Sequence, residues 1–173
     1  MIRNKRCYYL AEGECEEKLI NALKEKPSLI VSGKAKKYNV VQQELTTSQL
    51  MTFAPGSIVI LVFDTDVELT DILKRNIALL RKQCRGVEVM TITEVLNFED
   101  EIERATDVDK AQDLTKSISV SEFKTAVNKM KAAEFRHALN RHKFDLDKLW
   151  IKEPPAKFRF LSQDGEKIKT GDK

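Results

Sequence analysis

The sequence predicts an α/β fold in which a four-stranded, mostly parallel sheet is flanked by helices and followed by a C-terminal helical extension. Two observations support this prediction. Residues 7–11 and 57–63 are short apolar runs rich in β-branched and aromatic residues, as is typical of strands buried on both faces. Helical patterns separate such runs, and an alternation of strand and helix implies right-handed crossovers and a parallel sheet.

The elements follow one another in a regular order. They are a strand, helix, strand, helix, strand, helix and strand at residues 7–11, 14–26, 28–32, 40–53, 57–63, 68–84 and 87–92. The first and third of these helices carry apolar residues at helical spacing along one face. We therefore expect an α/β core over 1–105, a helical extension over 106–161 packed on it, and a disordered polar tail over 162–173.

The composition is that of a highly charged globular protein. The 173 residues include 30 Lys and Arg against 27 Asp and Glu, so the net charge of +3 does not by itself indicate nucleic acid. The sequence has no apolar run of about 18 residues that could span a bilayer. Its three cysteines lack metal-ligand spacing and fit reduced, buried thiols. We therefore expect a cytoplasmic protein without membrane contact.

Acidic side chains gather where two of the predicted strands end. Glu12 follows the first strand, and Asp64 and Asp66 follow the third, so all three are expected at the edge of the sheet where ligands bind. Clustered carboxylates repel one another unless protons or a cation neutralise them, and hard oxygen ligands suit Mg²⁺ or Mn²⁺. The alternative for Asp64 and Asp66 is a turn with an N-cap for the following helix.

The residues around these acids resemble the motifs of the TOPRIM (topoisomerase–primase) family. The segment "YYLAEGECEE", which contains Glu12 and Glu16, resembles the family's first motif, and "IVILVFDTD" resembles its second. The resemblance covers residues 5–105 and implies a parallel four-stranded sheet with Mg²⁺-dependent phosphoryl transfer on nucleic acid. It implies that Glu12 is a metal ligand or the general acid/base. Asp64 and Asp66 would hold the metal, with Glu16 as an outer ligand.

Within this family, the chain is most similar to the small OLD and RloB-like nucleases of phage defence and DNA repair. The segment "ITEVLNFEDEIERA" resembles the region after their fourth strand, with Asn97, Phe98 and Glu99 as the matching residues. The alternative is an ordinary amphipathic helix that buries Phe98. Unlike OLD proteins, the chain lacks a G-x-x-x-x-G-K-[ST] motif, so ATPase function would require a separate ATPase subunit as partner.

Two basic segments are candidates for contact with nucleic acid. The first, "GKAKKY", is expected to form a loop beside the acidic crevice, with Tyr38 available to stack on a base. The second is a long helical pattern over residues 123–144. The side chains expected to face nucleic acid are Lys34, Lys36, Lys37, Lys124, Arg136 and Arg141. The alternatives are a solvated loop and a solvated helix.

The function predicted from these patterns is a metal-dependent nuclease that cleaves RNA or DNA. One alternative is a scaffold that binds nucleic acid or a partner ATPase without cutting. Another is a phosphatase of the haloacid dehalogenase type, suggested by "FDTDV" but disfavoured because that motif normally ends the first strand. Residues 145–161 are expected either to dock back as an edge strand or to pair with a second copy as a homodimer.

Overall fold

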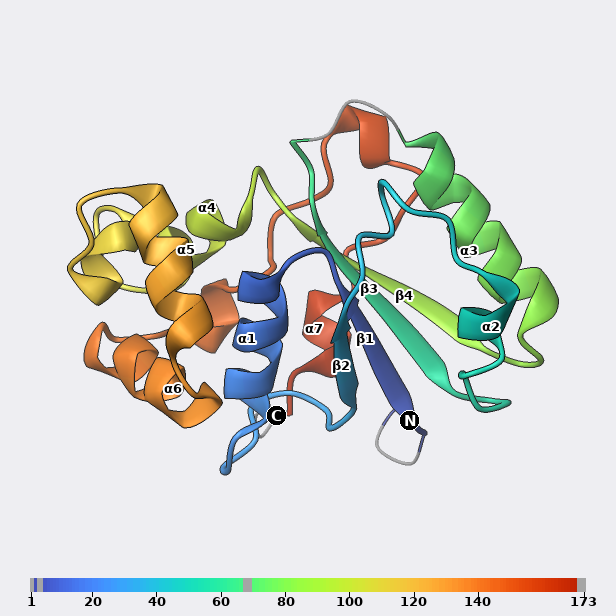
Figure 1. Ribbon diagram of the computed structural model, residues 1–173, viewed down its shortest axis with the longest axis horizontal. Helices are drawn as coiled ribbons and strands as arrows, with labels where there is room; N and C mark the ends of the chain where they lie inside the picture. Colours follow the sequence, from blue (N-terminus) through green and yellow to red (C-terminus); the bar gives the residue numbers. More distant parts are fainter. Residues whose placement is uncertain (1, 3–4, 67–69, 171–173) are drawn as a thin grey trace.

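The computed structural model describes residues 2, 5–66 and 70–170 and contains a four-stranded, all-parallel sheet flanked by helices (Figure 1). The strands are β1 (Cys7–Ala11), β2 (Lys34–Lys37), β3 (Ile58–Asp64) and β4 (Glu88–Glu94), and their order across the sheet is β2-β1-β3-β4. The predicted α/β fold class is therefore confirmed. Every residue of β3 except Asp64 is buried, as expected of a central strand in a parallel sheet.

The helices cover both faces of this sheet. They are α1 (Glu14–Lys24), α2 (Thr47–Leu50), α3 (Asp71–Gln83), α4 (Phe98–Ala105), α5 (Val120–Lys129), α6 (Ala132–Arg141) and α7 (Gly165–Ile168). Single turns of 3₁₀ helix are η2 (Ala111–Thr115), η3 (Leu146–Lys148) and η4 (Ala156–Phe158). Among the described residues, none of the helices is both long and apolar enough to cross a bilayer.

Two hydrophobic clusters lie on opposite faces of the sheet. Because successive strand residues point to opposite faces, Tyr9 of β1 joins the cluster under α1, α4, α5 and α6, whereas Leu10 joins the cluster under α2 and α3. Figure 1 shows α1 and α4–α6 on one side of the strands and α2 and α3 on the other. The cysteines are all free and buried, as predicted.

The second strand lies later in the chain than the prediction placed it. Residues 28–32 contribute only one isolated bridge, between Ile30 and Lys169, and the strand is Lys34–Lys37, which was expected to be a loop. The three lysine side chains of this edge strand are exposed to solvent, so its sequence "KAKK" lacks the apolar pattern that predicts a strand. Ile30 and Val31 instead pack in the hydrophobic cluster on the face of the sheet that α1 covers, which explains the apolar character of this segment.

The helix predicted over 40–53 is reduced to the single turn α2. Buried Asn76 of α3 accepts from the Leu45 N–H at 2.8 Å and donates to the carbonyls of Val40 and Gln43 at 2.8 Å each. This amide thereby supplies the hydrogen bonds that a helical backbone would otherwise make for itself. The start of the helix predicted over 68–84 falls partly on residues 67–69, outside the described residues, and α3 begins at Asp71.

The long helix predicted over 123–144 is two helices. The backbone is extended at Met130 and Lys131, and α6 then begins with the Glu134 carboxylate accepting from the Lys131 N–H at 2.8 Å. The break lets both α5 and α6 pack against α1. A hydrophobic pattern alone does not reveal such a change of direction, because the apolar spacing continues through it.

The segment after residue 161 was expected to be frayed, and the structure contradicts this for residues 162–170. Asp164 is buried, accepts from the Thr91 N–H at 2.9 Å and donates its own N–H to the Thr91 carbonyl at 2.8 Å. Gln163 makes similar contacts with Thr93. This polar segment therefore covers the free edge of β4, and residues 145–161 do not form the expected edge strand.

Candidate metal centre at the carboxyl end of the sheet

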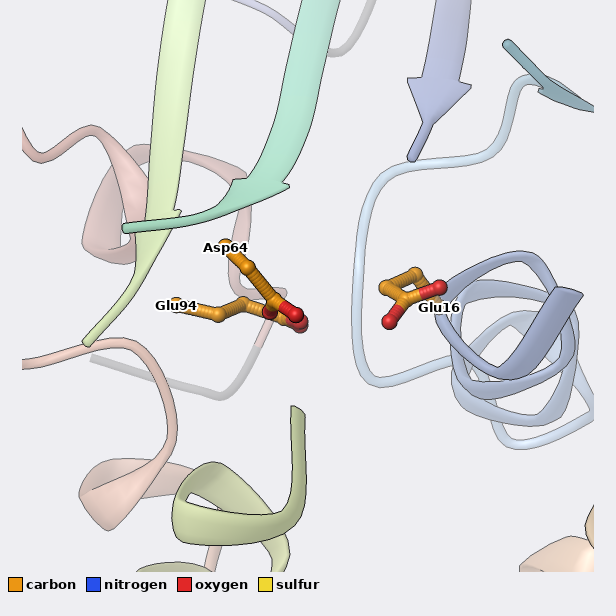
Figure 2. Close-up of side chains that lie close together, drawn as sticks. All are labelled: Glu16, Asp64 and Glu94. Carbon is orange, nitrogen blue, oxygen red and sulfur yellow. The ribbon is translucent and has the colours of Figure 1, made fainter. Parts of the chain in front are cut away.

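Three carboxylates converge where β3 and β4 end. Glu16, Asp64 and Glu94 each offer an oxygen that lies within 4.8 Å of the other two. Figure 2 shows Asp64 and Glu94 side by side, with Glu16 pointing toward them from α1. This group of three acids, called the acidic triad below, can hold a metal ion.

The fold explains how residues so distant in sequence come together. Asp64 and Glu94 are register partners in the parallel pair β3 and β4, so their side chains leave the same face next to each other. Glu16 lies in the first turn of α1, which begins directly after β1. A Cβ atom at Gly13 would lie 2.5 Å from Glu16 Oε2, so the glycine leaves the space that this carboxylate occupies.

The triad differs from Glu101 and Asp164, two other buried acids of the protein, in its lack of partners. Glu101, for example, accepts from the Val95 N–H at 3.2 Å and the Trp150 N–H at 2.9 Å, and it pairs with Arg104. Within the described part of the chain, the Glu94 carboxylate accepts a hydrogen bond only from the Trp150 indole, at 3.1 Å. One buried oxygen each of Glu16, Asp64 and Glu94 has no hydrogen-bond partner among the described residues.

Such unpartnered oxygens are costly in a protein interior, because a buried polar group without a partner loses its hydration and gains nothing in return. Glu16 is 6% exposed and Glu94 is fully buried. Protons or a divalent cation would compensate this cost, and three convergent carboxylates are a typical ligand set for a hard cation. The geometry of the triad therefore fits a metal ion.

Burial and mutual repulsion favour the protonated forms of these acids. The pKa of Asp64 is raised to about 8, mainly by burial and, to a smaller extent, by the nearby Glu16 and Glu12 carboxylates. The pKa of Glu16 is also raised, mainly by burial and, to a smaller extent, by the charge of Glu12. The pKa of Glu94 lies well above its usual value, mainly because this side chain is fully buried. In the absence of a cation, protons therefore neutralise part of the triad.

Glu12, predicted as ligand or acid/base, lies beside the triad but outside it. Its Oε1 accepts from the Asn39 amide at 2.9 Å, and its Oε2 accepts from the Asp64 N–H at 3.0 Å. Burial is the main reason that the pKa of Glu12 is raised. Hydrogen-bond donors thus hold both oxygens of this carboxyl group in place.

Two members of the triad, Glu16 and Asp64, line a cavity of about 470 Å³, called the acidic cavity below. Glu12 and Glu14 contribute further acidic groups to its wall, and Lys37 and Lys124 contribute the cations. Lys37 pairs with Glu14 at 2.7 Å, and Lys124 of α5 pairs with Glu99 at 2.9 Å. Burial disfavours the charge on Lys124, but its hydrogen bond with Glu99 and the nearby Asp64 and Glu16 keep its pKa above the usual value.

The remaining predicted residues divide between this cavity and other surfaces. Asp66 is exposed and outside the triad, although its charge raises the pKa of both Glu12 and Asp64. Asp64 and Asp66 do not cap α3, whose N-cap residue is Thr70. Lys34 and Lys36 are exposed on β2 and line a different cavity.

The predicted cations of α6 do not line the acidic cavity. Arg136 was expected to remain in water, but it is partly buried, which lowers its pKa. Arg141 is exposed on the outer face of α6. In the segment after β4, Asn97 accepts from the Asp100 N–H at 3.0 Å as the N-cap of α4, and Phe98 stacks on Phe123 with ring centroids 6.1 Å apart.

Glu94 is the member of the triad that the sequence analysis missed. The predicted fourth strand ends at residue 92, two residues too early, so the prediction does not place Glu94 at a strand end. Extending the rule that ligands bind at the carboxyl ends of strands to β4 would have identified Glu94. Its hydrogen-bond partner Trp150 lies 56 residues further along the chain, and no sequence pattern predicts that the two residues are in contact.

Comparison with protein-family models, with curated proteins and with solved structures finds no match for this chain.

Proposed function

We propose that this protein is a metal-dependent nuclease of the TOPRIM type that cleaves phosphodiester bonds in RNA or DNA. One observation carries the proposal: three carboxylates, each with a buried oxygen that has no hydrogen-bond partner among the described residues, converge at the carboxyl end of a parallel sheet. Two of them, Glu16 and Asp64, line a cavity that also contains two lysines. Ligands bind at this end of parallel sheets. Carboxylates alone would repel a phosphodiester, and the lysines offset that repulsion.

The residues of the site have separate roles in this proposal. Glu16, Asp64 and Glu94 hold Mg²⁺ or Mn²⁺, which when bound would polarise the phosphoryl group and favour ionisation of a water nucleophile. Lys37 and Lys124 attract the phosphate backbone into the acidic cavity.

Glu12 is the proposed proton acceptor. The Asn39 amide and the Asp64 N–H fix the orientation of its carboxyl group, and its raised pKa lies closer to neutrality than that of an ordinary glutamate. A general base is most effective when its pKa lies near the working pH. Glu12 therefore suits the transfer of a proton from an attacking water.

The test is a cleavage assay on labelled RNA and DNA, single-stranded and duplex, with Mg²⁺, Mn²⁺ or EDTA. We expect cutting that needs the metal and that falls by at least about 100-fold in Asp64→Asn and Glu94→Gln, as is typical when a group essential to the chemistry is lost. Glu14→Gln is the matched control, because Glu14 lines the same cavity but is exposed and outside the triad. Metal-independent cutting, or equal activity in all variants, would contradict the proposal.

A further inference from the structure

A second cavity lies against the edge strand β2, on the face of the sheet that carries α2. It measures about 370 Å³, within the range of roughly 300–1,000 Å³ that is usual for small-molecule sites. Tyr8, Tyr38 and Phe53 give it aromatic walls, and Lys34 and Lys36 lie at its edge. The proposed cleavage chemistry uses none of these side chains.

Strand register explains why both lysines face this cavity. Lys34 is aligned with Tyr8 and Lys36 with Leu10, and aligned residues of neighbouring parallel strands point to the same face. Lys37, one residue further, is aligned with Ala11 and therefore points to the opposite face, where it pairs with Glu14. The three lysines of this segment thus serve two different cavities.

Residues 38 and 39 connect the two cavities. Tyr38 lines both of them, and its hydroxyl donates to the Glu44 carbonyl at 2.6 Å. The next residue, Asn39, holds Glu12 of the acidic cavity through the 2.9 Å hydrogen bond described above. Because Tyr38 lines both cavities, a ligand in the second cavity lies next to the acidic one.

We propose that the second cavity, called the base cavity below, binds an unpaired base of a single-stranded nucleic acid whose adjoining phosphate enters the acidic cavity. This inference rests on the proposed nuclease function and names its substrate class. Aromatic side chains offer flat apolar surfaces on which a base can stack, and lysines attract the flanking phosphates. In a duplex the faces of each base are covered by its neighbours, so only an unpaired or extruded base can enter such a cavity.

The test measures binding by fluorescence anisotropy in EDTA, so that it does not depend on cleavage. The probes are labelled RNA and DNA single strands of about 12 nucleotides, a blunt duplex of the same sequence, and the same backbone with abasic nucleotides. We expect the single strand to bind at least about fivefold more tightly than the abasic strand, which corresponds to the lower limit for one stacked base. Equal affinity for the abasic strand, or tighter binding of the duplex, would overturn the inference.

A matched pair of variants tests the aromatic wall itself. Tyr38→Leu removes the ring, whereas Tyr38→Phe keeps the ring and removes only the hydroxyl that bonds to Glu44. We expect the leucine variant to lose about fivefold or more in affinity for the single strand and the phenylalanine variant to bind nearly as the parent does. If both variants lose affinity equally, the hydroxyl contact rather than base stacking is responsible, and the inference fails.

A second pair of variants tests the cations. Replacing Lys34 and Lys36 together by Ala should reduce the slope of log affinity against log salt by up to about 0.7 per lost contact. Replacing Lys110 and Lys116, which are exposed beside η2 on the helical extension, should leave the slope unchanged. Identical slopes in both double variants would overturn the proposed role of the base cavity.

The two proposals fail in different ways. A protein that binds single strands through Tyr38 but does not cut them with Mn²⁺ would contradict the nuclease function and leave the base cavity in place. A protein that cuts, and whose binding and cleavage are unaffected by Tyr38→Leu and by abasic substitution, would overturn the base cavity alone.

Discussion

At the scale of single residues, two groups of acids with buried side-chain oxygens contrast with each other, whereas buried Glu99 forms an ion pair with Lys124. Glu101 and Asp164 have several hydrogen-bond donors each, and they serve the architecture by bonding to backbone N–H groups of other elements. Glu16, Asp64 and Glu94 keep oxygens without a partner among the described residues. Because an unpartnered buried carboxylate destabilises a fold, the second group is the one that points to a ligand.

Gly13→Ala tests whether Glu16 belongs to the ligand set. The backbone of Gly13 is extended, with φ of −128°, so alanine is compatible with it, but the added Cβ would meet Glu16 Oε2 and displace this carboxylate. We expect Mn²⁺ affinity to fall by about tenfold or more, measured by titration calorimetry. Glu17→Ala, in the same turn but outside the triad, is the control. Unchanged affinity in Gly13→Ala would remove Glu16 from the proposed site.

The raised pKa of Asp64 predicts a pH dependence of stability in EDTA. Folded Asp64, with a pKa of about 8, keeps its proton at pH values where the unfolded chain, with an ordinary carboxyl pKa near 3.8, has lost it. The folded state therefore binds more protons in this window, and the free energy of unfolding should decrease as pH rises from about 4 to about 8. Urea denaturation at a series of pH values measures this.

Two comparisons identify the source of that pH dependence. Asp64→Asn should flatten the curve and leave the protein equally or more stable near neutral pH, since it removes a carboxyl group that the folded state must keep protonated. Mn²⁺ should restore stability at the alkaline end, because it binds the deprotonated carboxylates of the folded state. Stability in EDTA that stays constant or increases over the window would contradict the electrostatic description of the triad.

At the scale of elements, strands and helices with strong apolar patterns were predicted well, and elements held by polar contacts were not. Strand β1 and helix α1 follow directly from their burial patterns. Strand β2 lacks such a pattern because both its edge and most of its side chains face solvent. The structure of residues 162–170 depends on side chains that hydrogen-bond to the backbone of β4. Such contacts produce no periodic pattern in the sequence.

The same limit applies to the candidate site. The rule about strand ends placed Glu12 and Asp64 correctly at one edge, because it depends only on strand direction. It could not show that Glu94, rather than Asp66, completes the triad, because that depends on the register between β3 and β4. Nor could it show that Lys124 reaches the acidic cavity, since this requires the packing of α5 on α1 and α4.

Asp164→Ala tests the role of the segment after residue 161. The substitution leaves the buried Thr91 N–H without its 2.9 Å acceptor and also removes the 2.6 Å pair with Lys167. We expect the free energy of unfolding to fall by about 1–3 kcal/mol, the usual cost of an unsatisfied buried donor, as measured by urea denaturation. The exposed Glu153 provides the control: Glu153→Ala should change stability by less than about 0.5 kcal/mol. Equal stability of the two variants would mean that this segment does not hold the edge of β4.

At the scale of the whole molecule, the helical extension and the sheet build the acidic cavity together. The sheet and α1 supply the acids, and α5 supplies Lys124, which is anchored by Glu99 of α4 (Figure 1). The base cavity is built differently, from β1, β2 and the chain that runs through α2. Tyr38 lines both cavities, so they lie next to each other.

The most direct test of the central claim is anomalous diffraction from crystals grown with Mn²⁺. If the acidic triad binds a metal ion, we expect an anomalous manganese peak between Glu16, Asp64 and Glu94. The peak should lie about 2.0–2.3 Å from a carboxylate oxygen of at least two of them, as is usual for small hard divalent ions. Crystals of Glu94→Gln grown in the same way should show a weaker peak or none. A parent crystal in which the three carboxylates are ordered but bind no manganese, or in which manganese binds only elsewhere, would contradict the account.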